Sequence, residues 1–102
     1  MNRRHQNLQI VAAANIQQLS VIIPALNEAG CIRELCTDLQ PLRSRGHELI
    51  LVDGGSDDQT LALGKSLVDI MLSSARGRAL QMRAGAAAAS GTILWFLHAD
   101  TG

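Results

Sequence analysis

The chain has 102 residues, enough for one small domain with a modest hydrophobic core. Nine Lys and Arg residues balance nine Asp and Glu residues, so the formal net charge is zero. This balance argues against a nucleic-acid-binding protein, because affinity for nucleic acid comes mainly from excess basic charge. The two aromatic residues, Trp95 and Phe96, also offer little surface for stacking bases. Apolar residues make up 47% of the chain, which argues against disorder.

The two cysteines, Cys31 and Cys36, lie in what we predict to be one helix, where their spacing suits neither a disulfide nor a metal site. We therefore expect reduced thiols and a cytoplasmic location. No segment has the apolar length of a signal peptide or a membrane span, and peripheral contact with a membrane stays open. We expect residues 1–17 to be a flexible extension and residues 18–102 to form the folded part.

The first predicted strand covers residues 19–23, a β-branched run that Pro24 should end. We expect Asn27 to cap the following helix, in which apolar residues recur at helical spacing. Pro41 should end or kink this helix near its last turn. A second apolar run predicts a strand over residues 48–52.

Ser56 and Gln59 have the spacing of a capping box, which predicts that a second helix begins just after Ser56. A short strand at 69–72, a helix at 76–89 rich in small residues, and a strand at 92–97 follow. Strands that alternate with helices at this spacing predict βαβ units. The sequence therefore predicts an α/β fold with a Rossmann-like, mainly parallel sheet.

Polar residues with ligand potential follow three of the predicted strands. Asn27 and Glu28 follow the first strand, residues 53–58 follow the second, and His98 and Asp100 follow the fourth. In an open parallel sheet, ligands bind outside the carboxyl ends of the strands. The sequence therefore predicts one site there that holds a cation, a ribose, or both.

Asp53 precedes two glycines, Gly54 and Gly55, which permit a sharp turn and the close approach of a ligand. Its carboxylate can accept hydrogen bonds from ribose hydroxyls or a base N–H, or it can cap the second helix. The residues alone leave both roles open. We expect Asp58, within the first turn of that helix, to compensate the helix dipole.

Asp100 follows an apolar run, a position that suits a carboxylate meeting a hard divalent cation such as Mg²⁺. Such a cation can neutralise charge on a departing diphosphate. For His98 we favour a hydrogen-bonding role at the strand end over metal ligation. Arg76 and Arg78 lie at a predicted helix start, where the backbone N–H groups and the helix dipole favour phosphate. The alternative is that one of the two arginines is simply solvated.

These motifs resemble glycosyltransferase family 2. Residues 20–28 (SVIIPALNE) are similar to the family's opening strand and nucleotide-contacting turn. Residues 52–60 (VDGGSDDQT) are similar to its second motif, usually VDDGSxDxT, and residues 98–100 (HAD) occupy the place of its Asp-x-Asp metal motif. Together with GRALQM at 77–82, they resemble a bacterial branch of the family with a His-Ala-Asp metal motif.

The resemblance implies a GT-A fold and metal-assisted, typically inverting transfer of a sugar from a nucleotide-diphosphate sugar to an acceptor. It implies a base and ribose pocket lined by Pro24, Ala25, Glu28 and Asp53. It also implies that Asp100 binds Mn²⁺ or Mg²⁺ at the diphosphate, assisted by Arg76 or Arg78, with His98 as an additional candidate ligand.

Two residues depart from the family pattern: Gly54 replaces the usual second Asp, and His98 replaces the first Asp of the metal motif. The family's acceptor site and catalytic base follow its metal motif, so we expect the base beyond residue 102 and this chain to be an amino-terminal portion. One alternative is a non-catalytic nucleotide-binding module or truncated remnant. Another is a GT-A-like nucleotidyltransferase, although a glycine- and lysine-rich loop after the first strand is missing. The nucleotide base, the sugar and the acceptor stay open.

Overall fold

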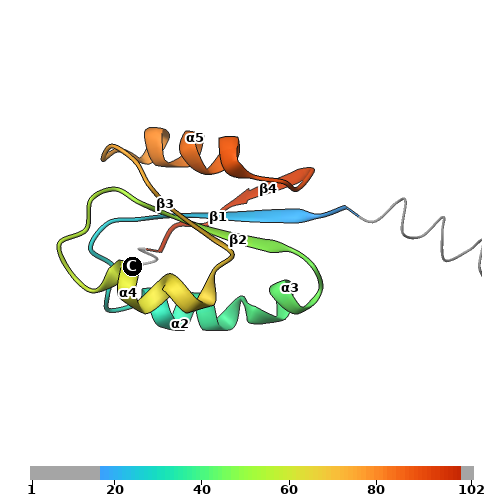
Figure 1. Cartoon of the computed structure of the whole chain (residues 1–102), viewed down its shortest axis with the longest axis horizontal. Coiled ribbons are helices and arrows are strands. Elements are labelled where there is room, and N and C mark those ends of the chain that lie inside the picture. Colours follow the sequence, from blue (N-terminus) through green and yellow to red (C-terminus); the bar gives the residue numbers. More distant parts are fainter. Residues whose placement is uncertain (1–16, 100–102) are drawn as a thin grey trace, which may run out of the picture.

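The computed structural model describes residues 17–99 and contains a four-stranded parallel sheet with helices on both faces (Figure 1). α5 covers one face, and α2, α3 and α4 cover the other. The elements are, in chain order, β1 (Leu19–Ala25), α2 (Ile32–Asp38), α3 (Gln40–Ser44), β2 (Glu48–Asp53), α4 (Thr60–Gly64), η1 (Lys65–Leu67), β3 (Ile70–Ser73), α5 (Arg78–Ala88) and β4 (Ile93–Phe96). The predicted α/β class and parallel Rossmann-like sheet are confirmed.

The strand order is β3-β2-β1-β4. The first three strands therefore lie side by side in chain order, from β1 through β2 to β3. The connection through α5 then leads back across the sheet and places β4 on the other side of β1. This reversal makes the carboxyl ends of β1 and β4 the topological switch point of the sheet. In open α/β sheets that crevice is where ligands bind.

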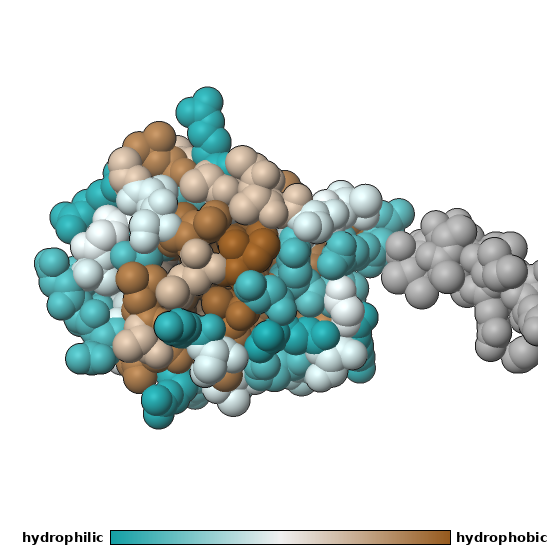
Figure 2. All heavy atoms as spheres, in the orientation of Figure 1, coloured by the Kyte–Doolittle hydropathy of each residue, from teal (hydrophilic) through white to brown (hydrophobic). Residues whose placement is uncertain are grey.

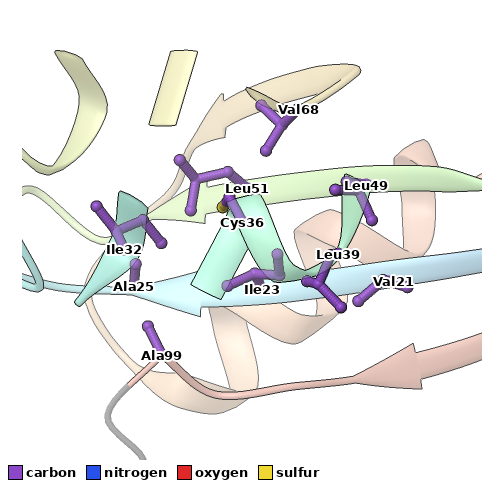
Figure 3. Close-up of a cluster of buried hydrophobic side chains, with 10 residues drawn as sticks. All are labelled: Val21, Ile23, Ala25, Ile32, Cys36, Leu39, Leu49, Leu51, Val68 and Ala99. Atoms are coloured by element: carbon purple, nitrogen blue, oxygen red, sulfur yellow. The ribbon is translucent and has the colours of Figure 1, made fainter. Parts of the chain in front are cut away.

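The core consists of two layers, because successive side chains of a strand point to opposite faces of the sheet. One layer packs Ile23 and Leu51 of the strands against Ile32 and Cys36 of α2, and Figure 3 shows this cluster. The other layer holds the alternate strand residues, including Ile22, under α5. Burial raises the pKa of the Cys36 thiol to about 11, so Cys36 stays protonated at neutral pH.

The small residues of α5 let this helix lie close to the sheet, as expected from the sequence. A Cβ added to Gly85 would lie 2.3 Å from Cγ2 of Ile22 and 3.1 Å from Cγ2 of Val52. Glycine at this position therefore sets the distance between α5 and the two central strands.

The sequence predicted that Pro24 would end the first strand. The strand instead continues through Pro24 to Ala25. The carbonyl of Ile22 accepts from Leu97 on the β4 side, and the carbonyl of Ala25 accepts from Gly54 on the β2 side. Residues alternate between the two sides, so Pro24 faces the β4 side, where the pairing register ends at Ile22. Its missing N–H therefore costs no sheet hydrogen bond.

The prediction that Asn27 caps the first helix is wrong. The helix begins at Ile32, after a turn in which the carbonyl of Glu28 accepts from the N–H of Ile32. Asn27 has a positive φ of 53°, and its side-chain oxygen accepts from the N–H of Asp57 instead. The predicted break near Pro41 is confirmed, since α2 ends at Asp38 and Pro41 lies in the first turn of α3.

The capping box that the sequence predicts at Ser56 and Gln59 does not form. α4 begins at Thr60, and the Ser56 hydroxyl donates to Asp53 and accepts from the N–H of Asn27. The Ser56 hydroxyl therefore bonds within its own loop and to the loop after β1, and not within the first turn of α4. Asp58 precedes α4 instead of lying in its first turn.

The third strand, the third helix and the fourth strand lie within one or two residues of their predicted positions. All four β4 side chains are exposed: Ile93 by 46%, Leu94 by 39%, Trp95 by 43% and Phe96 by 37%. In Figure 2, apolar residues are also exposed in the middle of the visible face, between the two helix layers. The predicted extension at 1–17 falls almost wholly outside the described residues. No helix between residues 17 and 99 has the length and apolar character needed to cross a membrane.

Candidate functional site

The loops that follow β1 and β2 are joined to each other by side-chain hydrogen bonds. The bonds run from the N–H of Asn27 to Ser56 Oγ (2.9 Å), from the N–H of Glu28 to Thr60 Oγ1 (2.8 Å), from the N–H of Ala29 to Asp58 Oδ2 (3.1 Å), and from the N–H of Asp57 to Asn27 Oδ1 (2.7 Å). The two loops therefore form one unit at the carboxyl edge of the sheet, as the sequence predicts for the polar residues there.

Asp53 organises the turn directly after β2. Its side chain is 2% exposed, and Oδ2 accepts from the N–H groups of Gly55 (3.0 Å) and Ser56 (2.8 Å), while Oδ1 accepts from the Ser56 hydroxyl. Gly55 has a φ of +101°, a conformation that side chains other than glycine rarely adopt. Asp53 therefore shapes the loop and does not cap α4, which begins seven residues later.

Asp58 stabilises the start of α4 and the neighbouring loop together. Its carboxylate accepts from the N–H and the hydroxyl of Thr60 and from the N–H of Ala29. The Thr60 hydroxyl is the main cause that holds the pKa of the Asp58 carboxyl below its ordinary value. This carboxylate therefore stays ionised at neutral pH and keeps both loops in register.

A pocket of about 270 Å³ opens at the switch point of the sheet. It is bounded by the end of β1 and the loop that follows it, by the start of α5, and by His98 after β4. Its lining residues are Pro24, Ala25, Leu26, Glu28, Arg76, Gly77, Arg78, Gln81 and His98. Six residues proposed from the sequence therefore come together here, namely Pro24, Ala25, Glu28, Arg76, Arg78 and His98. Asp53 is not among the lining residues.

The start of α5 gives the pocket its positive side. Gly77, with a φ of 138°, is the N-cap residue, and no acidic residue lies in the first turn of this 11-residue helix. Arg76 and Arg78 flank Gly77 and are both exposed. The N–H groups at a helix start and the positive end of the helix dipole, together with two guanidinium groups, suit a phosphate or diphosphate. Among the described residues that line the pocket, Glu28 is the only one with a carboxylate.

The segment after β4 is anchored to the core at Ala99, the middle residue of the His-Ala-Asp sequence at 98–100. Ala99 is 1% exposed and lies beside Ala25 and Ile32 at one end of the cluster drawn in Figure 3. The Sγ atom of Cys31 lies 3.1 Å from the carbonyl oxygen of Ala99 and 3.2 Å from Oε2 of Glu28. Cys31 was not predicted to take part, because its contact with Ala99 joins residues 68 positions apart.

The predicted metal ligand Asp100 lies outside the described residues. Between residues 17 and 99, no group of three or more His, Cys, Asp or Glu side chains is arranged to hold a metal ion. His98 lines the same pocket as the two arginines. Mg²⁺ is often held by only one or two carboxylates together with substrate phosphates, so a cation does not require three described side chains.

Leu26, Gly77 and Gln81 are the lining residues to which the sequence assigned no role, and of these only Gln81 has a polar side chain. Gln81 lies in α5, is 4% exposed, and lines the pocket. In the sequence, the segment 77–82 that contains Gln81 contributed only to the family resemblance. A signal was present, since a polar residue at a helix position that faces a sheet needs partners for its buried amide.

Solved structures of similar fold include that of glucosyl-3-phosphoglycerate synthase from Mycobacterium tuberculosis in complex with Mn²⁺, UDP and glucosyl-3-phosphoglycerate. That protein is 29% identical to this chain with a TM-score of 0.76, and the match covers 88% of this chain and 36% of the other. The structure of the same synthase with Mg²⁺ and UDP has 28% identity, a TM-score of 0.77, and coverage of 90% and 36%. A third structure, with Mn²⁺, UDP-glucose and phosphoglyceric acid, has 29% identity, a TM-score of 0.77, and coverage of 87% and 35%.

The chain thus spans only about 36% of the length of the synthase that it resembles. No curated protein matches the chain in sequence. The family model described as "Glycosyl transferase family 2" matches residues 20–101. This range includes the loops after β1 and β2, the arginine turn (residues 76–78) and the His-Ala-Asp motif. The chain belongs to glycosyl transferase family 2.

Proposed function

We propose that this chain forms the nucleotide-sugar-binding part of a glycosyltransferase that transfers a sugar from a nucleotide-diphosphate sugar to an acceptor. The observation that carries the proposal is the pocket at the switch point. It brings a carboxylate, Glu28, to one side and the arginine turn of residues 76–78 to the other. This arrangement offers hydrogen-bond acceptors for a nucleoside and positive charge for a diphosphate within one cavity.

The nucleoside is proposed to lie against Pro24 and Ala25 at the end of β1, with Glu28 accepting hydrogen bonds from its hydroxyl or N–H groups. We keep Asp53 as a proposed fourth residue of this subsite. A carboxylate has about four lone-pair positions, and the Asp53 turn uses three of them. The similar synthase structures contain UDP, so UDP is the first nucleotide to test.

The diphosphate is proposed to bind the start of α5 through Arg76 and Arg78. The proposed metal is Mn²⁺ or Mg²⁺, held by Asp100 with His98 as an additional candidate. When bound, the cation would neutralise charge on the diphosphate. The acceptor and the catalytic base are not assigned to any of residues 17–99. We propose a cytoplasmic location, because Cys31 and Cys36 are not joined in a disulfide.

Isothermal titration calorimetry with UDP and GDP, each with and without Mn²⁺, tests the proposal. The chain is expected to bind one of the two nucleotides, and more tightly with Mn²⁺ present. The variant Arg76→Ala should raise the Kd about 10- to 100-fold, because a hydrogen bond to a charged group is worth about 1.5–3 kcal/mol.

Arg83→Ala is the matched control, because Arg83 is exposed on α5, just after the turn that contains Arg76, and does not line the pocket. This variant should bind with the Kd of the unmodified chain. The absence of binding to UDP and GDP in the presence of Mn²⁺ would contradict the proposal. Equal effects of the two arginine substitutions would remove Arg76 from the site.

A further inference from the structure

Gln81 uses its whole side-chain amide to join three parts of the pocket. Its Nε2 group donates to the carbonyl oxygens of Ala25 and Val52, both at 3.0 Å. Its Oε1 accepts from the N–H of Gly77 at 3.3 Å. These partners also fix the orientation of the amide, since two carbonyls need a donor and an N–H needs an acceptor.

The three partners lie on different elements. Ala25 is the last residue of β1, Val52 is close to the end of β2, and Gly77 is the centre of the arginine turn. The turn therefore has a direct hydrogen-bonded connection to the carboxyl ends of the two central strands. Because Gln81 is 4% exposed, water does not readily replace these bonds.

Gly54 provides the space that this arrangement needs. A Cβ added to Gly54 would lie 2.8 Å from Oε1 and 2.9 Å from Cδ of Gln81. Gly54 does not have a positive φ, in contrast to Gly55 beside it, so backbone conformation is not the reason for a glycine there. A side chain at position 54 would instead require the Gln81 amide to move. The departure from the family pattern at position 54 thus has a physical explanation.

We propose that Gln81 is a positioning residue of the nucleotide pocket, which holds the arginine turn at the strand ends, and that Gly54 is its obligatory partner. Gln81 acts through Arg76 and Arg78, since its own donors and acceptor are bound to the protein. This proposal rests on the proposed function, because it assigns a role within the same site.

Calorimetry with UDP and Mn²⁺ on a double-mutant cycle tests this role. Gln81→Met has nearly the same length and removes the hydrogen bonds, so it should raise the Kd about tenfold or more. Arg76→Ala should then cost less than about threefold in the Gln81→Met background, because the turn is already displaced. An undiminished effect of Arg76→Ala in that background would show that Gln81 serves stability alone and would overturn the proposal.

The glycine half of the proposal has its own test. Gly54→Ala should weaken UDP binding about as much as Gln81→Met does, since the added methyl group displaces the amide. In a Gln81→Ala background, Gly54→Ala should add no further loss of binding, because the space is then empty. Gly30→Ala is the control, because a Cβ at Gly30 meets no atom within 4 Å. Equal binding by Gly54→Ala and Gly30→Ala would contradict the pairing.

The outcomes distinguish a failure of the Gln81 role from a failure of the proposed nucleotide-binding function. If the unmodified chain binds neither UDP nor GDP, the proposed function fails and this role fails with it. If the unmodified chain binds UDP and Gln81→Met binds it equally well, only the role of Gln81 fails. Should Gln81→Met not fold, the cycle is run with Gln81→Ala, which removes the amide and introduces no larger or charged group.

Discussion

The carboxylate of Asp53 holds three donors from the residues that follow it, in a position almost inaccessible to water. Removing such a group leaves the N–H groups of Gly55 and Ser56 without their acceptor inside the turn. These hydrogen bonds are part-buried and go to a charged group, so we expect their loss to cost about 1–3 kcal/mol. Asp53 therefore carries a structural role, whatever contact it makes with a ligand.

We predict that Asp53→Ala lowers the free energy of unfolding by about 1–3 kcal/mol in the absence of nucleotide. Urea denaturation followed by circular dichroism measures this change. Asp57→Ala is the matched control, because Asp57 is exposed in the same loop and uses its backbone N–H to bind Asn27. Equal stability of the two variants would show that the turn forms without the carboxylate.

At the scale of the element, the distance between α5 and the sheet depends on a single missing side chain. Helix propensity alone predicts that Gly85→Ala stabilises α5 by about 1 kcal/mol. The short distance from a new Cβ to Ile22 predicts the opposite sign, because the methyl group would overlap a buried side chain.

We predict that Gly85→Ala lowers the free energy of unfolding by about 1–3 kcal/mol, measured by urea denaturation. Ala87→Gly, at an exposed position of the same helix, calibrates the propensity effect. In an Ile22→Ala background the loss from Gly85→Ala should shrink, since the overlapping atoms are gone. A gain in stability from Gly85→Ala in the unmodified chain would mean that α5 moves away from the sheet at little cost.

The elements differ in how far the sequence could predict them. The strands were predicted because β-branched and apolar runs with polar ends mark buried parallel strands. The start of α4 was not predicted, because Ser56 and Asn27 bond across two loops that are 29 residues apart in sequence. Gln81 escaped prediction for the same reason, since its acceptors on β1 and β2 lie 56 and 29 residues away. Local rules identify an element, and long-range hydrogen bonds decide its ends and its buried polar partners.

At the scale of the whole molecule, the sheet is well covered in its middle and open at β4. β4 pairs with β1 on one side, and every one of its side chains is at least 37% exposed. An exposed apolar edge strand offers unpaired backbone groups and apolar area to any other strand. A protein of exactly these 102 residues is therefore expected to associate with itself through β4.

We predict that the sedimentation coefficient of the 102-residue chain rises with concentration, and that Trp95→Lys shifts this rise to about tenfold higher concentration or more. The physical reason is that burial of one large apolar side chain is worth about 1.5–3 kcal/mol, while a lysine at an edge opposes pairing. Met71→Lys is the matched control, since Met71 is 38% exposed on the opposite edge strand, β3. Trp95 is the only tryptophan, so its fluorescence should shift to shorter wavelength as β4 becomes covered. A larger effect of Met71→Lys, with no change in tryptophan emission, would place the contact at β3 instead.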